Sequence, residues 1–175
     1  DICAGAVASS KEKIDKIWSF SKKFGGSLSD YTAWLLERSM KTLTVRFYEQ
    51  QKNAKILSSF LNDSSSIEKV HFPGIENNEF YAIACKQMDG FGAVISFELK
   101  KNISPKEFLT SLELINPSMS FAGVESSMLS PAETSHQLLS KKERIEQGIV
   151  DNLIRFSVGI EAVSYTHLRA HETSI

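Results

Sequence analysis

The stretch from residue 27 to residue 72 contains neither glycine nor proline. Its apolar residues recur at steps of three, four and seven, which places them along one side of an α-helix. These residues are Leu36, Met40, Leu43, Phe47, Ala54, Leu57 and Leu61. Ser29 suits the N-cap, and a polar cluster over residues 62–66 stops the pattern. We predict one long helix over residues 29–62, about 50 Å in length if unbroken, which would act as a spine shared by two lobes.

Shorter elements are predicted on both sides of this helix. Residues 2–8 are small and apolar and predict a short buried strand, followed by a helix that Ser9 or Ser10 caps and that ends at Gly25-Gly26. Beyond residue 62, we predict strands over 70–72, 92–100, 121–126 and 153–161, and helices over 79–88, 104–112 and 140–148. This order predicts an α/β chain, and α+β for its later part: a small, mostly antiparallel sheet with helices on one face.

The charge balance and the cysteine count exclude several classes of partner. The 175 residues include 20 Lys plus Arg and 21 Asp plus Glu, a net charge of −1. This is not the basic surface that nucleic acid or anionic lipid requires, and no apolar run approaches the roughly 18 residues of a membrane span. Two cysteines, Cys3 and Cys85, are too few for a disulfide framework. We therefore expect no nucleic-acid or membrane partner and a reduced, cytoplasmic setting.

Few residues suggest chemistry by their spacing. The chain has no glycine-rich phosphate loop and no cysteine pair at metal-binding spacing. His167 and His171 are four residues apart, as two metal ligands on a helix would be, but neither an acidic residue nor a cysteine accompanies them. We therefore assign no metal site.

Arg155 is the strongest candidate from the residues alone. Alternation along residues 153–161 places apolar side chains on one face and Arg155, Ser157 and Gly159 on the other. An arginine in such a strand needs a carboxylate partner, because burying an unpaired charge is costly. The residues alone favour a structural salt bridge, and the alternative is the carboxylate of a ligand, which the planar guanidinium can bind through two hydrogen bonds.

Several segments in order resemble one enzyme family. They are residues 1–7, 28–43, 70–74, 90–99, 120–126, 131–136 and 153–161. Together they resemble the Cys/Met-metabolism enzymes that use pyridoxal phosphate, the family of cystathionine γ-synthase and cystathionine β-lyase. The resemblance extends from Asp1 to about Val163. It implies an aminotransferase-like type I pyridoxal-phosphate fold, of which this chain would be the C-terminal part.

The resemblance implies roles for three residues. Arg155 lies in the family's Arg-hydrophobic-Ser-x-Gly-hydrophobic-Glu motif, whose arginine binds the substrate α-carboxylate. Ser120 opens a motif that lies beside the cofactor lysine, and Met119 occupies the preceding position, which helps to select the substrate. The chain departs from the family pattern at Phe121 and Ala122, where leucine and glycine are usual, so the loop geometry is open.

The resemblance also implies what the chain does not contain. The lysine that carries pyridoxal phosphate would precede Asp1, so we assign no catalytic, cofactor-binding or metal-binding residue within the chain. We expect residues 1–28 to be a remnant of the cofactor-binding domain, 29–62 the linking helix and 63–163 the substrate-binding domain. Residues 164–175 do not continue the family's acidic terminal helix, and we expect them to be a non-native tail.

The implied function is transsulfuration on sulfur amino acids. The first interpretation is a fragment of a cystathionine γ-synthase-like enzyme, which replaces the acyl group of an O-acylhomoserine by cysteine. The alternatives are a cystathionine β-lyase or γ-lyase that cleaves a C–S bond, and, in another class, a non-enzymatic α/β binding module. The family further implies a small-molecule amino-acid substrate and a homotetramer for the full-length enzyme.

Overall fold

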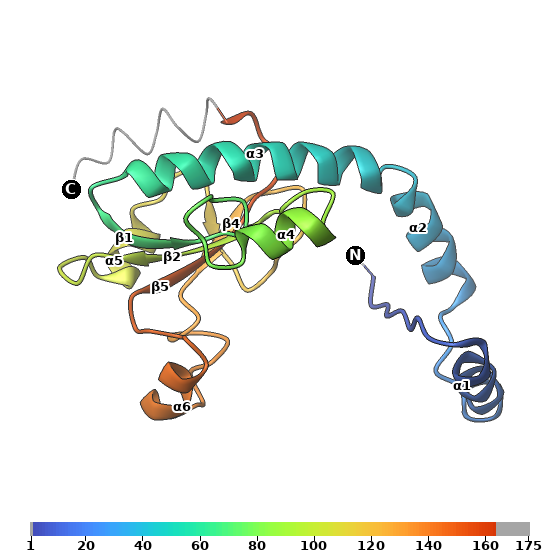
Figure 1. Cartoon of the computed structure of the whole chain (residues 1–175). Coiled ribbons are helices and arrows are strands. Elements are labelled where there is room, and N and C mark those ends of the chain that lie inside the picture. Colours follow the sequence, from blue (N-terminus) through green and yellow to red (C-terminus); the bar gives the residue numbers. More distant parts are fainter. Residues whose placement is uncertain (1, 164–175) are drawn as a thin grey trace. The chain divides into compact units, whose positions relative to one another are not determined.

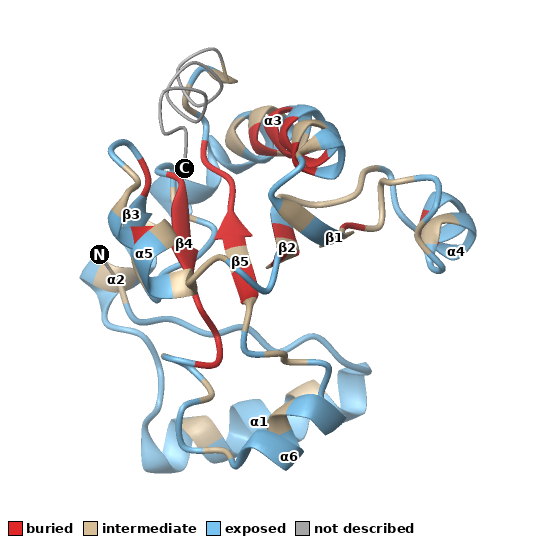
Figure 2. Ribbon diagram, turned by 90° about the vertical axis from the view of Figure 1, so that its left-hand side faces the viewer, coloured by how far each residue is buried: buried red, intermediate tan, exposed pale blue. Residues whose placement is uncertain are grey.

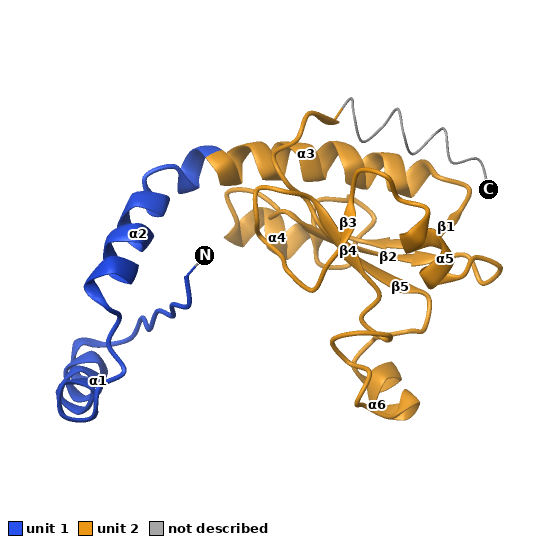
Figure 3. Ribbon diagram, turned by 180° about the vertical axis from the view of Figure 1, so that it is seen from behind, with its two compact units in different colours: residues 1–45 blue, residues 46–175 orange. Residues whose placement is uncertain are grey.

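The computed structural model describes residues 2–163, which fall into two compact units (Figure 3). The first unit comprises residues 1–45 and the second residues 46–175. The boundary lies inside the region for which we predicted one linking helix. The predicted non-native tail, residues 164–175, lies outside the described residues, as do His167 and His171.

The first unit contains α1 (Lys11–Phe24) and α2 (Asp30–Met40). The hydroxyl of Ser29 caps α2 by accepting a hydrogen bond from the Thr32 amide at 3.2 Å, as predicted. Gly25 ends α1 with a φ of 81°, a conformation that favours glycine. Neither helix buries a residue within the described structure.

The predicted strand over residues 2–8 is wrong. Residues 3–8 are exposed and form no strand. A short apolar run becomes a strand only when a neighbouring strand pairs with its backbone, and no described strand does so here.

The predicted linking helix is divided into α2 and α3 (Leu43–Asp63) by a turn at Lys41 and Thr42. The Lys41 amide donates to the carbonyl of Arg38 at 3.3 Å, a bond one residue shorter than that of an α-helix. The hydroxyl of Thr42 donates to the carbonyl of Ser39 at 3.4 Å. Hydroxyl groups that bond to nearby carbonyls compete with helical hydrogen bonds, which accounts for a turn that the apolar periodicity does not reveal.

The second unit is built on a five-stranded sheet (Figure 1). Its strand order is β1 (Ile67–His71), β2 (Val94–Leu99), β5 (Leu153–Ser157), β4 (Ser127–Leu129) and β3 (Asn116–Pro117). All neighbours pair antiparallel except β3 and β4, so the sheet is mostly antiparallel, as predicted. The short helices α4 (Tyr81–Gln87), α5 (Pro105–Thr110) and α6 (Lys141–Glu146) lie in the connections.

The core lies between α3 and one face of the sheet (Figure 2). β2 contributes Ile95, Phe97 and Leu99, each 0% exposed, and β5 contributes Ile154 and Phe156. α3 covers them with Ala54, Leu57 and Leu61, which belong to the predicted apolar stripe. Alternation along β5 therefore sends Arg155 and Ser157 to the opposite face, as predicted from the sequence.

The predicted strands beyond residue 62 have different bounds in the structure. β1 is Ile67–His71 where 70–72 was predicted, and β2 is Val94–Leu99 where 92–100 was predicted. The segment predicted as a strand over 121–126 is a loop that contains Ala122 at a φ of 60°, and the strand β4 begins at Ser127. The last strand ends at Ser157 rather than at Glu161, and Ile160 is 39% exposed. A residue in the left-handed region cannot continue a strand, which explains the loop.

The core position of Leu99 can be tested against an exposed leucine. We expect Leu99→Ala to lower the free energy of unfolding by about 2–5 kcal/mol, because it removes a fully buried side chain. Leu138 is 96% exposed, so Leu138→Ala should change it by less than about 0.5 kcal/mol. Urea denaturation followed by circular dichroism measures both values, and equal effects of the two variants would contradict the described core.

Candidate functional site

Arg155 occupies the middle of β5, between the buried side chains of Ile154 and Phe156. It lies opposite Ser96 of β2 and Leu129 of β4. A strand paired on both sides fixes the direction of its side chains, so β5 holds the guanidinium on the face away from the core. Burial lowers the pKa of Arg155, an ordinary consequence of removing a cation from water.

The guanidinium contacts the backbone of the two other predicted site residues. Its Nη2 donates to the carbonyl of Met119 at 3.0 Å and to the carbonyl of Ser120 at 3.1 Å. The structure therefore brings Arg155, Ser120 and Met119 together from β5 and from the loop before β4. The contacts use main-chain oxygens, and the side chains of Met119 and Ser120 are exposed.

Arg155 has no carboxylate partner among the described residues. Its described hydrogen bonds go to carbonyl groups, and no described ion pair includes it. The Nε atom is buried and makes no hydrogen bond to a described residue. Carbonyl dipoles compensate a cation less completely than a carboxylate does. The structural salt bridge that the residues alone favoured is thus not found in the described part of the chain.

The site loop, residues 118–126, is fixed to the sheet and to α3 by side chains. The hydroxyl of Ser127 donates to the carbonyl of Ser120 at 2.9 Å, and the hydroxyl of Ser157 accepts from the amide of Ala122 at 2.8 Å. Gln50 of α3, which is buried, donates to the carbonyl of Gly123 at 2.7 Å. These three side chains hold the loop in a conformation that its own sequence would not select.

The end of the site loop packs closely against the chain that follows β5. The hydroxyl of Ser126 donates to the Glu161 carboxylate at 3.0 Å and accepts from the Gly159 amide at 2.9 Å. A Cβ atom at Gly159 would lie 2.4 Å from the carbonyl oxygen of Val124, a distance that no side chain tolerates. Glycine is therefore required here for the two segments to approach.

Sequence reasoning missed the residues that hold the loop. Ser157 was placed on the face of Arg155, and Phe121 was noted as a departure from a family pattern, but neither was connected to Arg155. The ring of Phe121 lies 5.0 Å from the guanidinium carbon of Arg155. The sequence around Gln50 and Ser127 does not indicate their roles. Gln50 bonds to a residue 73 positions away in the sequence, and the bond of Ser127 depends on the conformation of the loop.

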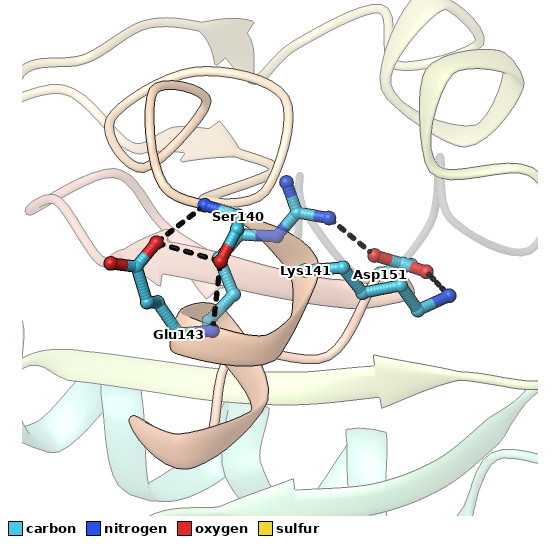
Figure 4. Close-up of polar contacts among 5 residues, drawn as sticks. Ser140, Lys141, Glu143 and Asp151 are labelled. Carbon is cyan, nitrogen blue, oxygen red and sulfur yellow. Dashed lines mark hydrogen bonds and ion pairs between the residues drawn. The ribbon is translucent and has the colours of Figure 1, made fainter.

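A second polar cluster lies at α6 (Figure 4). Lys141 Nζ and Arg144 Nη2 contact the two carboxylate oxygens of Asp151 at 2.6 and 2.8 Å. Ser140 and Glu143 form a capping box at the start of the helix. Since both cations already engage Asp151, this cluster anchors α6 and is not a ligand site.

Comparison with known proteins identifies the family. The family model described as Cys/Met metabolism PLP-dependent enzyme, where PLP is pyridoxal phosphate, matches residues 1–165. The chain belongs to this family. The resemblance found in the sequence is thereby confirmed.

Curated relatives carry several names within the family. The chain is 38% identical over 164 residues to cystathionine beta-lyase of Lactococcus lactis subsp. cremoris (strain MG1363). The aligned residues cover 93% of this chain and 43% of that protein. The chain is 40% identical over 166 residues to L-methionine gamma-lyase of Fusobacterium nucleatum subsp. polymorphum, with coverage of 93% and 42%. It is 35% identical over 162 residues to chloroplastic cystathionine gamma-synthase 1 of Arabidopsis thaliana, with coverage of 92% and 29%. The chain thus spans less than half the length of these relatives.

Solved structures confirm the predicted fold class. The cystathionine gamma-lyase of Lactobacillus plantarum, complexed with L-serine, superposes with a TM-score of 0.89 at 34% identity, covering 94% of this chain and 43% of that one. The cystathionine gamma synthase of Xanthomonas oryzae pv. oryzae, in complex with cystathionine, gives 0.88 at 30% identity, covering 95% and 43%.

The described residues around Arg155 do not include the groups that bind pyridoxal phosphate. Pyridoxal phosphate needs a lysine for its covalent link and several donors for its phosphate. No described lysine contacts Arg155, and Lys41, the lysine in the family-like segment 28–43, pairs with Glu37 at 3.4 Å. Within residues 2–163 no group of His, Cys, Asp and Glu is arranged to hold a metal ion. The described helices include none with the length and apolar character needed to cross a membrane.

The α6 cluster predicts a pH-dependent contribution to stability. The hydrogen bond from Lys141, with a smaller contribution from Arg144, lowers the pKa of Asp151. A lowered folded-state pKa stabilises the fold above the unfolded value of about 3.9, and this contribution is lost as the pH falls through the folded value. Because the Asp151 side chain is 53% exposed, we expect Asp151→Asn to cost less than about 1 kcal/mol at neutral pH.

Urea unfolding measured between neutral pH and about pH 3 tests this expectation. The difference between the parent chain and Asp151→Asn should shrink towards zero at the acid end. Asp89, which has no described ion pair, supplies the matched control Asp89→Asn, for which we expect no such trend. A difference that grows on acidification would contradict the assignment.

Proposed function

We propose that this chain supplies the substrate-carboxylate site of a pyridoxal-phosphate-dependent enzyme that acts on sulfur amino acids. The observation that carries the proposal is Arg155, a cation held on β5 without a carboxylate partner among the described residues. A free amino acid brings the missing group, because its α-carboxylate matches the planar guanidinium. Membership of the Cys/Met-metabolism family supports this choice of ligand.

Arg155 would orient the substrate and take no proton itself. Arginine stays charged at neutral pH, so its role is to bind the carboxylate and to fix the position of the α-carbon. Nη2 already contacts two carbonyl oxygens, whereas Nη1 makes no hydrogen bond to a described residue. A carboxylate would therefore meet Nη1 first and compete with the carbonyls of Met119 and Ser120 for Nη2.

Met119 and Ser120 would then line the site through exposed side chains. Met119 is 64% exposed and lies next to the guanidinium through its carbonyl. We propose that its side chain contacts the substrate side chain and that the Ser120 hydroxyl faces the reacting end. When bound, the cofactor supplies the electron sink that loosens bonds at the substrate carbons.

The exposed apolar side chains of the first unit support the proposal that this chain is part of a larger protein. α1 and α2 bury no residue, yet they carry large apolar side chains that are more than half exposed. Examples are Trp18 at 59%, Phe20 at 65%, Phe24 at 73% and Trp34 at 54%. Such surface normally packs against other protein. We propose that residues 1–28 belong to a cofactor-binding domain, 29–62 link it to a substrate-binding domain over 63–163, and the whole enzyme is a cytoplasmic homotetramer.

Within this class we propose γ-replacement of an O-acylhomoserine by cysteine, with β- or γ-cleavage of a C–S bond as alternatives. The likeness to the Xanthomonas oryzae gamma synthase supports the first. The likenesses to the beta-lyase and gamma-lyases support the others equally. The reaction must therefore be decided by products.

A chimaera tests both the site and the reaction. Residues 2–163 would replace the matching segment of the Lactococcus lactis cystathionine beta-lyase, and products would be compared with those of the parent lyase. Cystathionine made from O-acylhomoserine and cysteine, absent from the parent, supports γ-replacement by this chain. Cleavage of cystathionine alone, as in the parent, overturns γ-replacement in favour of a lyase.

In the chimaera, Arg155→Ala should raise KM for the amino-acid substrate by about ten- to a hundredfold, since a hydrogen bond to a charged group contributes roughly 1.5–3 kcal/mol. Arg155→Lys should raise KM by a smaller factor, because lysine keeps the positive charge but lacks the planar guanidinium that binds a carboxylate through two hydrogen bonds. Arg144→Ala at α6 is the control and should leave KM unchanged. An unaltered KM in Arg155→Ala would refute the carboxylate site.

The chain by itself should not turn over these substrates. Incubated with pyridoxal phosphate and passed through a desalting column, it should retain no visible cofactor absorbance, because no described lysine lies at the site. Retained absorbance that is lost in Lys41→Arg would contradict this expectation.

A further inference from the structure

Two serines occupy paired positions on neighbouring strands beside Arg155. Ser127 of β4 and Ser157 of β5 are paired in register, and they are 8% and 1% exposed. Ser157 lies two residues beyond Arg155, so it shares the face of the guanidinium. Both hydroxyls are directed to the site loop instead of to each other.

The two serines bracket a single residue of the loop. Ser127 holds the carbonyl of Ser120 at 2.9 Å, and Ser157 holds the amide of Ala122 at 2.8 Å. The residue between these two anchored groups is Phe121. Its ring lies 5.0 Å from the guanidinium carbon of Arg155, within the range of a cation–π contact.

The bracket imposes a backbone conformation that Ala122 does not favour. Ala122 has a φ of 60° and is the one non-glycine residue with a positive φ in the described chain. Such a conformation persists only where surrounding contacts enforce it. Ser157 enforces it at Ala122, and Gln50 of α3 adds a bond to the next residue, Gly123, at 2.7 Å.

Arg155 is consequently held in two independent ways. The carbonyls of Met119 and Ser120 hold Nη2 in the plane of the guanidinium. The guanidinium carbon lies over the Phe121 ring, 5.0 Å from the ring centroid. Together these contacts restrict rotation of the guanidinium before a ligand arrives, which lowers the entropy lost on binding.

We propose that Phe121 is a positioning residue for Arg155, and that the paired hydroxyls of Ser127 and Ser157 set the place of its ring. The order of the guanidinium rests on contacts within the chain. Its consequence for an amino-acid carboxylate rests on the proposed function.

The experiment uses the whole 175-residue chain labelled with ¹⁵N in its arginine side chains, with Arg155→Lys to assign the guanidinium signals by NMR. We expect Arg155 to show separate, slowly exchanging Nη–H signals shifted upfield by the aromatic ring. Phe121→Leu should abolish the ring-induced shift and average the signals. Phe121→Tyr should retain both, and the matched control Phe80→Leu, at a phenylalanine 60% exposed, should change neither.

The serine variants separate the bracket from the ring itself. Ser127→Ala and Ser157→Ala keep Phe121, so loss of the Arg155 signature in either of them shows that the hydroxyls place the ring. A signature unchanged in both serine variants overturns the bracket. A signature unchanged in Phe121→Leu overturns the positioning role, and because Phe121 is 62% exposed, that variant should keep the fold.

A titration with L-serine, and separately with acetate, connects the order of Arg155 to binding. The half-saturating concentration at the Arg155 signals should rise about two- to thirtyfold in Phe121→Leu, as a cation–π contact implies. An equal value in both chains overturns the positioning role. If Phe121→Leu averages the signals but neither probe perturbs Arg155 in the parent chain, the positioning role stands and the proposed carboxylate site fails.

Discussion

The pairing of β5 with β2 is the constraint on which the rest of the second unit depends. It places Ile154 and Phe156 beside Ile95 and Phe97 in one apolar layer under α3. The same pairing places the Arg155 side chain on the face of the sheet away from the core, since successive side chains of a strand point to opposite faces. Core burial on one face therefore fixes the position of a cation on the other face.

The loop before β4 supplies the described hydrogen-bond partners of Arg155. Carbonyl groups of Met119 and Ser120 hold Nη2 of Arg155, but they do not neutralise it. A protein carboxylate at this point would have formed a closed salt bridge and left little for a ligand to gain. Because neutral dipoles hold the cation, its charge has no described carboxylate to compensate it, and the proposed carboxylate site rests on this feature.

The sequence predicts the parts of the fold that are decided locally. The alternation in β2 and β5 and the hydroxyl cap at Ser29 are confirmed, because period and capping act over a few residues. The predicted cap of α1 is confirmed only in position, since Ser10 occupies the N-cap but its hydroxyl makes no capping bond to a described residue. The side of Arg155 follows from the same alternation. The loop at residues 121–126 was predicted as a strand because its conformation is decided from afar: Ser157 is 35 residues from Ala122, and Gln50 is 73 from Gly123. The strand propensity of a few neighbouring residues does not reveal partners so far away in the sequence.

The polar residues of α3 explain why β5 stops where it does. Gln50 donates to the carbonyls of Gly123 and Val158, and Asn53 donates to those of Gly159 and Glu161. These carbonyls would need a neighbouring strand if β5 continued, because buried carbonyls must be paired. Side-chain amides take the place of that strand, and they hold the chain after β5 and the site loop against one helix. α3 therefore helps the sheet to hold the segments around Arg155, although α3 makes no described hydrogen bond to the guanidinium.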